Sequence, residues 1–154
     1  STCYFEGSVV SLGRGTEHPF EMYGSPDMRL FSYKFVPQSM PGALHPDYEG
    51  QECSGVDLTT LTYEEIWRNG INLNYIVNAY SMLMSLPGAD RERGLLPDGR
   101  LFFGRNPFID KLIGNSWVRE KIIDGCSPED IKSMWKDDVE RFKSLRRKYL
   151  LYNE

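Results

Sequence analysis

The pattern of apolar and polar positions divides the chain into a strand-rich first part and a helical remainder. Residues 1–60 are rich in glycine, proline, aromatic and β-branched residues, which predicts strands at residues 4–11 and 30–37 and around residues 55–58. From residue 60 onward, apolar positions recur at the spacing of helices. This order indicates an α+β fold, in which a small mixed sheet from the N-terminal part packs with the C-terminal helices in a single domain, residues 1–154.

Alternation along the second predicted strand, RLFSYKFVP, places Phe31, Tyr33 and Phe35 on one face, which is the candidate core face. The segment that follows, PQSMPGALHPDYEGQ, contains three prolines and two glycines, and it predicts an irregular surface loop.

Helix boundaries have clear local signals. Thr62 and Glu65 have the spacing of a capping box, which predicts a short helix that Gly70 ends. The other predicted helices are one over residues 73–86 that ends at Pro87-Gly88, one or two turns over 107–113 closed by Gly114, and one over 117–124 that ends at Gly125. A polar loop is expected between residues 89 and 105, with RLFFG as a candidate short strand.

The last predicted helix begins at Ser127-Pro128, where serine is a favourable N-cap and proline suits the first helical position. Its apolar residues form one stripe, which predicts that this face packs in the core. The stripe consists of Ile131, Met134, Trp135, Val139, Phe142, Leu145 and Tyr149.

The composition is that of a globular domain, with 40% hydrophobic and 26% charged residues. The formal net charge of −4, from 18 basic and 22 acidic residues, argues against generic nucleic-acid binding. No apolar run approaches the ~20 residues that span a bilayer, so no transmembrane segment is expected. The chain does not begin with methionine, and it is expected to be a piece of a longer protein or a processed form.

Several well-known catalytic motifs are absent, namely GxxxxGK[ST], HExxH, GxSxG and GxGxxG. Cys3, Cys53 and Cys126 are widely separated and form no metal-ligand spacing with His18 or His45, so no metal and no cofactor are expected. One disulfide with a free thiol and three buried apolar cysteines are both compatible with this spacing.

The opening segment, CYFEGSVVSLGRGTEHPFEMYG, holds the remaining candidate chemistry. Glu6 projects from a strand that is predicted to be at least half buried, and Arg14, in a glycine-rich turn, is its nearest cationic partner. From the residues alone, a structural Glu–Arg pair at a strand end is favoured over a functional pair, and both interpretations stay open.

Three stretches carry a resemblance to a known family: FEGSVVSLGRGTEHPFEMYGSP, CSGVDL and the closing W…F…R…YLLY. Over essentially the whole chain they resemble the C-terminal half of the NamZ-type exo-β-N-acetylmuramidases, formerly a bacterial family of unknown function. These enzymes release N-acetylmuramic acid from the non-reducing ends of peptidoglycan glycans. The resemblance implies a longer protein, whose N-terminal Rossmann-like domain is absent here and contains the principal catalytic carboxylate.

The resemblance also implies a substrate cleft between the two domains, with this chain as one wall. Muramyl glycans and the N-terminal domain of the same protein are the expected partners, and an exported or periplasmic location in a bacterium follows. The 154-residue chain alone is expected to be inactive. The alternative is a non-catalytic carbohydrate-binding, partner-binding or structural module. A binding module is expected to expose its aromatic side chains, whereas most aromatics here fall on stripes predicted to be buried.

The positions of this chain that match the family motif are Glu6, Gly7, Arg14, Gly15, Thr16, Pro19 and Phe20. Glycoside hydrolysis usually needs two carboxyl groups, and Glu6 is the first candidate for a catalytic one in this chain. Val9 stands where family members often have asparagine, so a polar contact with the sugar is not expected there.

The candidate substrate-binding residues are Arg14, Gly15, Thr16, Glu17, Phe20, Tyr23 and His45. Arg14 is a candidate to bind the lactyl carboxylate of muramic acid through two hydrogen bonds. Glu17 is the second-ranked carboxylate. Phe20 and Tyr23 are candidates for stacking on a sugar ring, although core packing is favoured for both. His45 has the weakest claim, at the rim of the cleft.

Overall fold

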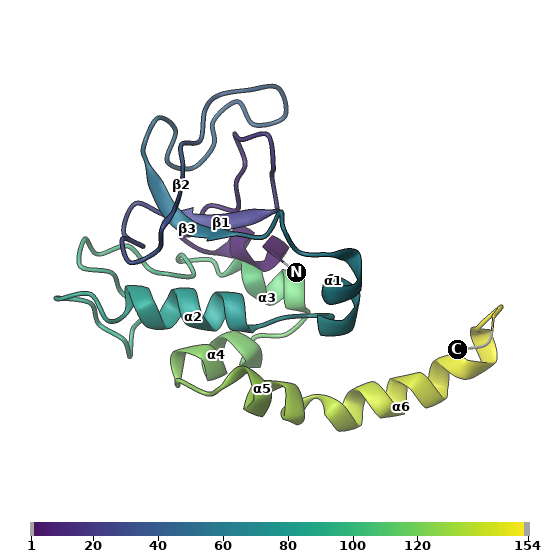
Figure 1. Ribbon diagram of the computed structural model, residues 1–154. Coiled ribbons are helices and arrows are strands. Elements are labelled where there is room, and N and C mark those ends of the chain that lie inside the picture. The colour runs from purple at the N-terminus through teal and green to yellow at the C-terminus, as the bar shows by residue number, and fades with distance from the viewer. Residues whose placement is uncertain (1, 153–154) are drawn as a thin grey trace.

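A three-stranded sheet lies on one side of the molecule and most of the helices lie on the other (Figure 1). The computed structural model describes residues 2–152. Strands β1 (Met22–Ser25), β2 (Tyr33–Phe35) and β3 (Cys53–Asp57) are arranged in the order β1-β3-β2. The α+β class is confirmed, but the sheet is antiparallel rather than mixed, since β3 runs antiparallel to both neighbours. Loops, and not crossover helices, connect these strands, which is the usual connection for antiparallel pairs.

The first predicted strand is wrong, because the chain forms a 3-10 helix there, η1 (Thr2–Gly7). Its buried residues are three apart, Thr2 with Phe5 and Tyr4 with Gly7, which is the period of a 3-10 helix and not of a strand. A Cβ atom on Gly7 would lie 2.4 Å from the backbone nitrogen of Ile109. The glycine therefore allows η1 to lie directly against α3 (Phe108–Ile113).

Strand β1 was not predicted, and β2 and β3 differ in extent from the runs predicted at residues 30–37 and 55–58. Gly24 of β1 is paired in register with Gly55 of β3. A Cβ atom on Gly55 would lie 1.9 Å from the carbonyl oxygen of Tyr23, so the two strands approach each other more closely than side chains permit. Because β1 pairs through a glycine, its residues do not alternate between apolar and polar. The alternation pattern used to predict strands therefore does not identify β1. The predicted core face of β2 is confirmed by the burial of Phe35.

The helix predictions are largely confirmed. Helix α1 (Tyr63–Asn69) begins with the predicted capping box: the Thr62 hydroxyl accepts from the Glu65 amide at 3.3 Å, and the Glu65 carboxylate accepts from the Thr62 amide at 2.8 Å. The next four helices are α2 (Asn74–Leu83), α3, closed by Gly114, α4 (Trp117–Ile123) and α5 (Pro128–Met134), which Ser127 caps. The candidate strand RLFFG is wrong, since residues 89–105 form turns joined by isolated bridges.

The core surrounds helix α2, whose buried residues are Ile76, Ala79, Tyr80 and Leu83. The Tyr80 ring packs edge-on against Phe102, with 5.1 Å between ring centroids, and its hydroxyl donates to the Arg91 carbonyl at 2.7 Å. Phe5 of η1, Val118 and Ile122 of α4 and Ile131 of α5 belong to the same cluster. Tyr23 of β1 also belongs to this cluster and attaches the sheet to the helices, whereas Met22, Phe35 and Cys53 of the strands form a second, smaller buried cluster.

The prediction of a core role for the last apolar stripe is wrong. The helix is interrupted at Trp135, and α6 (Lys136–Arg146) and the 3-10 turn η2 (Arg147–Tyr149) continue away from the rest of the molecule (Figure 1). Helix α6 has no buried residue, and of the seven residues in the stripe only Ile131 is buried. Helical periodicity reports that one face is apolar, but it does not report which surface covers that face. Among the described residues, no helix is long and apolar enough to cross a membrane.

Candidate functional site

The glycine turn of the opening segment is held in place by its own backbone. Gly13 and Gly15 have φ angles of 80° and 85°, in the left-handed region that favours glycine. The Thr16 hydroxyl donates to the Gly13 carbonyl at 2.7 Å, and the Gln38 amide donates to the Gly15 carbonyl at 2.8 Å. A Cβ atom on Gly15 would lie 2.7 Å from both the Gln38 carbonyl oxygen and the Pro46 ring. Gly15 and Thr16 therefore shape the turn and attach it to the loop over residues 37–50.

The turn directs Arg14 toward Glu6, which lies on η1 and not on a strand. An Arg14 Nη atom lies 3.5 Å from a Glu6 carboxylate oxygen, and the other Nη donates to the Gly42 carbonyl at 3.3 Å. The two side chains are 49% and 30% exposed, respectively. Both contacts are long, and exposed ion pairs contribute little stability, so each side chain has hydrogen-bonding capacity left for a ligand. The predicted partnership of Glu6 with Arg14 is confirmed as a contact.

The two aromatic candidates of the opening segment differ sharply in exposure. Tyr23 is 3% exposed and stacks on Phe5 with 4.7 Å between ring centroids, so its favoured role in the core is confirmed and its surface leaves no room for a sugar. Phe20 is 40% exposed, and the expectation of core packing is wrong for it. Its φ angle is 68°, which is uncommon for a residue with a side chain. Hydrogen bonds from its amide to the Leu12 carbonyl, at 2.7 Å, and from the Thr2 hydroxyl to its carbonyl, at 2.7 Å, hold this conformation.

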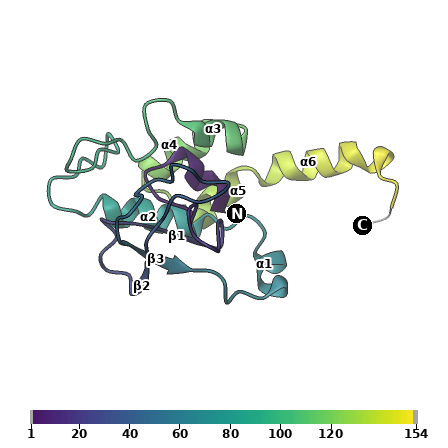
Figure 2. The same cartoon turned by 90° about the horizontal axis from the view of Figure 1, so that it is seen from above.

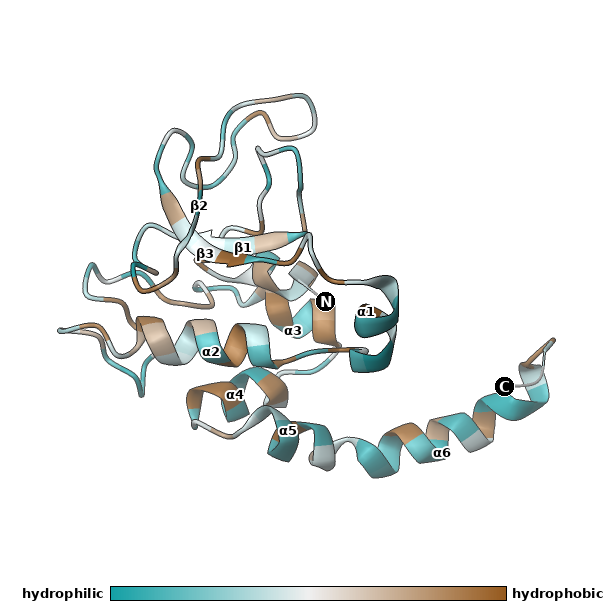
Figure 3. Ribbon diagram, in the orientation of Figure 1, coloured by the Kyte–Doolittle hydropathy of each residue, from teal (hydrophilic) through white to brown (hydrophobic). Residues whose placement is uncertain are grey.

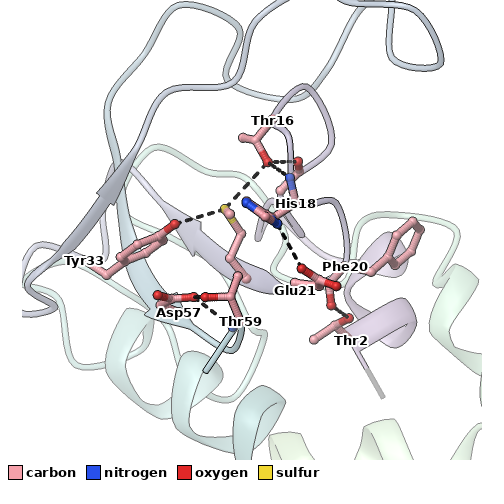
Figure 4. A network of polar contacts seen from close by, with 10 residues as sticks. Thr2, Thr16, His18, Phe20, Glu21, Tyr33, Asp57 and Thr59 are labelled. Atoms are coloured by element: carbon pink, nitrogen blue, oxygen red, sulfur yellow. Dashed lines mark hydrogen bonds and ion pairs between the residues drawn. The ribbon is translucent and has the colours of Figure 1, made fainter. Parts of the chain in front are cut away.

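A further polar group borders Phe20, and the sequence interpretation missed it. His18 Nδ1 lies 3.1 Å from a Glu21 carboxylate oxygen, and the His18 amide donates to the Thr16 hydroxyl at 3.2 Å (Figure 4). Asp57, at the end of β3, lies on the same side, and its pKa is lowered by hydrogen bonds from Thr59 and by the charge of His18. The H-x-x-E spacing of residues 18 to 21 is the signal that could have identified the pair.

Glu17 and His45 are exposed, and both lie in bends outside the helices and strands. Glu17 follows the turn directly. His45 precedes Pro46, whose ring packs against Gly15, so the loop of His45 lies beside the turn. The same loop is anchored by Tyr48, which donates to the Val9 carbonyl and accepts from Arg100 at 2.8 Å. The structure thus gathers Glu6, Arg14 and the exposed loop around them, and it removes Tyr23 from the set.

The cysteines match neither alternative considered from the sequence. All three thiols are free, and Cys53 is buried, Cys126 is half-buried and Cys3 is exposed. Burial raises the pKa of the Cys53 thiol to about 12. Within residues 2–152, no group of three or more histidine, cysteine or acidic side chains is arranged to hold a metal ion.

A known family and two relatives match this chain over nearly its whole length. Residues 1–152 match the sequence profile of the family described as the C-terminal part of the exo-beta-N-acetylmuramidase NamZ. The peptidoglycan beta-N-acetylmuramidase NamZ of Bacillus subtilis (strain 168) is 28% identical over 163 residues, which cover 99% of this chain and 36% of that protein. The crystal structure of a DUF1343 family protein from Bacteroides fragilis NCTC 9343 is 45% identical, with a TM-score of 0.85, and the match covers 100% of this chain and 39% of that one. The chain therefore spans less than half the length of these relatives.

Proposed function

Because this chain belongs to the family of C-terminal domains of the exo-β-N-acetylmuramidase NamZ, we propose that it is the smaller domain of a peptidoglycan-directed glycoside hydrolase. In this proposal, a larger N-terminal domain precedes residue 1, and the complete protein releases N-acetylmuramic acid from the non-reducing ends of glycans. The family match over residues 1–152 is the observation that carries the proposal. The relatives support it, since this chain accounts for only 36% and 39% of their lengths.

The substrate-facing surface in this proposal is the exposed pair of Glu6 and Arg14. Muramic acid differs from other peptidoglycan sugars in its lactyl carboxylate, and a guanidinium group binds a carboxylate through two parallel hydrogen bonds. The 3.5 Å and 3.3 Å contacts of Arg14 with Glu6 and the Gly42 carbonyl are weak enough to be exchanged for that carboxylate. Arg14 therefore recognises the sugar, while the Gly13–Gly15 turn holds the arginine in position before substrate binds.

Glu6 has one of two roles within the same site. Glycoside hydrolysis usually pairs two carboxyl groups ~5 to 9.5 Å apart, and a cleft between domains can place one on each wall. Glu6 contributes the carboxyl group of this wall in the catalytic role, and it orients Arg14 in the positioning role. Phe20, next to the turn and 40% exposed, provides an apolar face for the sugar ring. Glu17, directly after the turn, is the second-ranked carboxylate in this proposal, and His45 contributes to the rim of the site.

The test is an assay of the full-length protein with a MurNAc–GlcNAc disaccharide or a chromogenic muramide. We expect release of N-acetylmuramic acid by the full-length protein and none by the 154-residue chain alone. A Glu6→Gln variant that loses kcat with an unchanged KM supports the catalytic role, whereas a raised KM with little change in kcat supports the positioning role. Binding of glycans without hydrolysis by the full-length protein would instead favour the non-catalytic module.

We also propose that the protein acts outside the cytoplasm, in the periplasm or after export, because that is where its proposed substrate is found. Fractionation of the producing bacterium, followed by immunodetection with antibodies raised against this domain, tests the location. Recovery with cytoplasmic markers alone would contradict it.

A further inference from the structure

Exposed apolar side chains gather on two elements away from the Glu6–Arg14 pair. On α1 and just after it, Tyr63 is 77% exposed, Ile66 52%, Trp67 76% and Ile71 61%. On α6 and η2, Val139 is 41% exposed, Phe142 61%, Leu145 60% and Tyr149 75%. Apolar groups concentrated in this way mark an interaction surface more often than scattered single exposures do. These eight residues are called the α1–α6 surface below.

A groove joins the two halves of this surface. Its volume is about 570 Å³, and Cys3, Tyr4, Ile71, Leu112, Trp135 and Val139 are among the residues that line it. The groove therefore continues the apolar surface of α1 past the N-terminal helix η1 and the end of α3 to the beginning of α6. The two exposed groups thus form one surface rather than two separate patches.

Helix α6 and the turn η2 that follows it expose an apolar face along their length. Val139, Phe142, Leu145 and Tyr149 are spaced by three, three and four positions, so they lie on one face, and apolar bands alternate with polar ones along the helix (Figure 3). Within the described part of the chain, its main contacts are with α5 and η2, the elements on either side of it in sequence. An isolated helix of 11 residues is marginal in water, and most helical stability in proteins comes from packing of the apolar face.

We propose that the N-terminal domain of the full-length protein docks on the α1–α6 surface. This inference rests on the proposed function in so far as that domain exists. Helix η1, the first described element, begins near α1 in both views (Figures 1 and 2), and its residues Cys3 and Tyr4 line the groove, so a preceding polypeptide enters at this surface. In the two relatives, 64% and 61% of the protein lies outside the part that matches this chain, which is ample to cover it.

Docking at this surface would also bring the second domain to Glu6. Cys3 and Glu6 are both exposed and three positions apart in η1, and residues with this spacing lie on the same side of a 3-10 helix. Cys3 belongs to the groove and Glu6 lies one turn further on. A domain seated in the groove therefore has its edge next to the Glu6–Arg14 pair. The apolar surface sets the orientation of the two domains, and the polar pair stays free for substrate.

The experiment measures the accessibility of cysteines introduced into α6 of the full-length protein. Phe142→Cys places a thiol on the apolar face, and Ser144→Cys, which is exposed on the opposite face, is the matched control. The rate of maleimide labelling at each position is measured by peptide mass spectrometry, which separates it from labelling of the native cysteines. We expect the thiol at position 142 to react at least about tenfold more slowly than the thiol at position 144, with equal rates in denaturant.

A second pair on α1 keeps the test decisive if Phe142→Cys does not fold. Trp67→Cys lies on the apolar side of α1 and Arg68→Cys on the other, and the same contrast in rates is expected. Equal fast labelling within both pairs overturns the proposal. Protection that disappears on dilution also overturns it, because it identifies a second copy of the chain as the covering partner.

Failure of this inference is distinguishable from failure of the proposed function, since labelling does not depend on hydrolysis. Slow labelling of position 142 in a protein without muramidase activity leaves the docking surface in place and removes the enzymatic role. Hydrolysis by a protein in which positions 142 and 144 both react fast removes the docking surface and leaves the enzymatic role in place.

Discussion

At the scale of single residues, the candidate site combines a rigid backbone with loosely held side chains. The left-handed Gly13 and Gly15, and the hydrogen bonds that hold Phe20 at φ 68°, fix the path of the chain. Arg14 and Glu6, in contrast, meet through a single 3.5 Å contact between exposed groups. A backbone that is fixed before ligand binds, with side chains free to change partner, is the arrangement that favours binding over structural bracing.

The first residue-scale prediction concerns Arg14. Arg14→Gln in the full-length protein removes the charge proposed to bind the lactyl carboxylate, and we expect KM to rise by roughly 10- to 100-fold, since hydrogen bonds to charged groups contribute ~1.5 to 3 kcal/mol. The free energy of unfolding changes by less than about 0.5 kcal/mol, because the pair with Glu6 is exposed. Steady-state kinetics and urea denaturation measure the two effects. Arg93→Gln, in an exposed loop, is the charge-matched control. A loss of stability with unchanged KM would show that Arg14 is a structural brace.

The second residue-scale prediction concerns Cys53. Its thiol pKa is raised to about 12 by burial, so the reactive thiolate stays scarce until the pH approaches that value. We expect Cys53 to remain unmodified by iodoacetamide between about pH 7 and 9 in the folded protein, and to react readily in denaturant with an ordinary thiol pKa. Mass spectrometry of labelled peptides gives the measurement. Substantial modification at pH 8 in the folded protein would mean that the sheet opens locally around Cys53, the first residue of the central strand β3.

At the scale of elements, the sheet depends on the close approach of the β1 and β3 backbones at the Gly24–Gly55 pair. Few sequence patterns indicate such an approach. Predicted strands came from apolar and aromatic alternation, which identified the core face of β2 but not the glycine-paired β1. The helices were more predictable, because capping at Thr62 and Ser127 and termination at Gly70 and Gly114 are local signals. Strand pairing is set by residues that are distant in sequence. A glycine that is required because another backbone faces it cannot be distinguished in the sequence from any other glycine.

The glycine pair makes the sheet sensitive to the smallest side chain. Gly55→Ala would place a Cβ atom 1.9 Å from the Tyr23 carbonyl oxygen, a backbone atom that cannot move without separating β1 from β3. We expect destabilisation of about 3 kcal/mol or more, measured by urea denaturation. Gly42→Ala is the control, because its position has a left-handed φ of 88° but open space around it, and it is expected to cost only about 1 kcal/mol. Similar costs at both positions would show that backbone conformation, and not strand approach, sets the effect.

At the scale of the whole molecule, the family motif was predictable from the sequence, while the location of the partner surface was not. Glu6, Arg14 and the turn lie together within one short segment, so their proximity follows from local structure. The stripe of Val139, Phe142 and Leu145 was expected in the core of this domain, and it is exposed. Periodicity gives the same signal whether a helix is covered by its own domain or by another, since both bury one apolar face. Under the docking proposal, the N-terminal domain covers this stripe in the full-length protein, which reconciles the apolar periodicity of α6 with its exposure in residues 2–152.

A truncation separates the contribution of α6 to this domain from its contribution to the full-length protein. Ending the full-length chain after Trp135 removes α6 and η2 but none of the buried core residues, which all precede position 132. We expect hydrogen exchange of the α2 amides to be unchanged, because the core around α2 is intact. We expect muramidase activity to fall by roughly 10- to 100-fold, since loss of the docking face lets the two walls of the cleft move apart by an ångström or more.

Ending the chain after Tyr149 keeps the whole stripe and serves as the control, with activity retained. Full activity after truncation at Trp135 would mean that the orientation of the two domains depends on α1 and the groove alone.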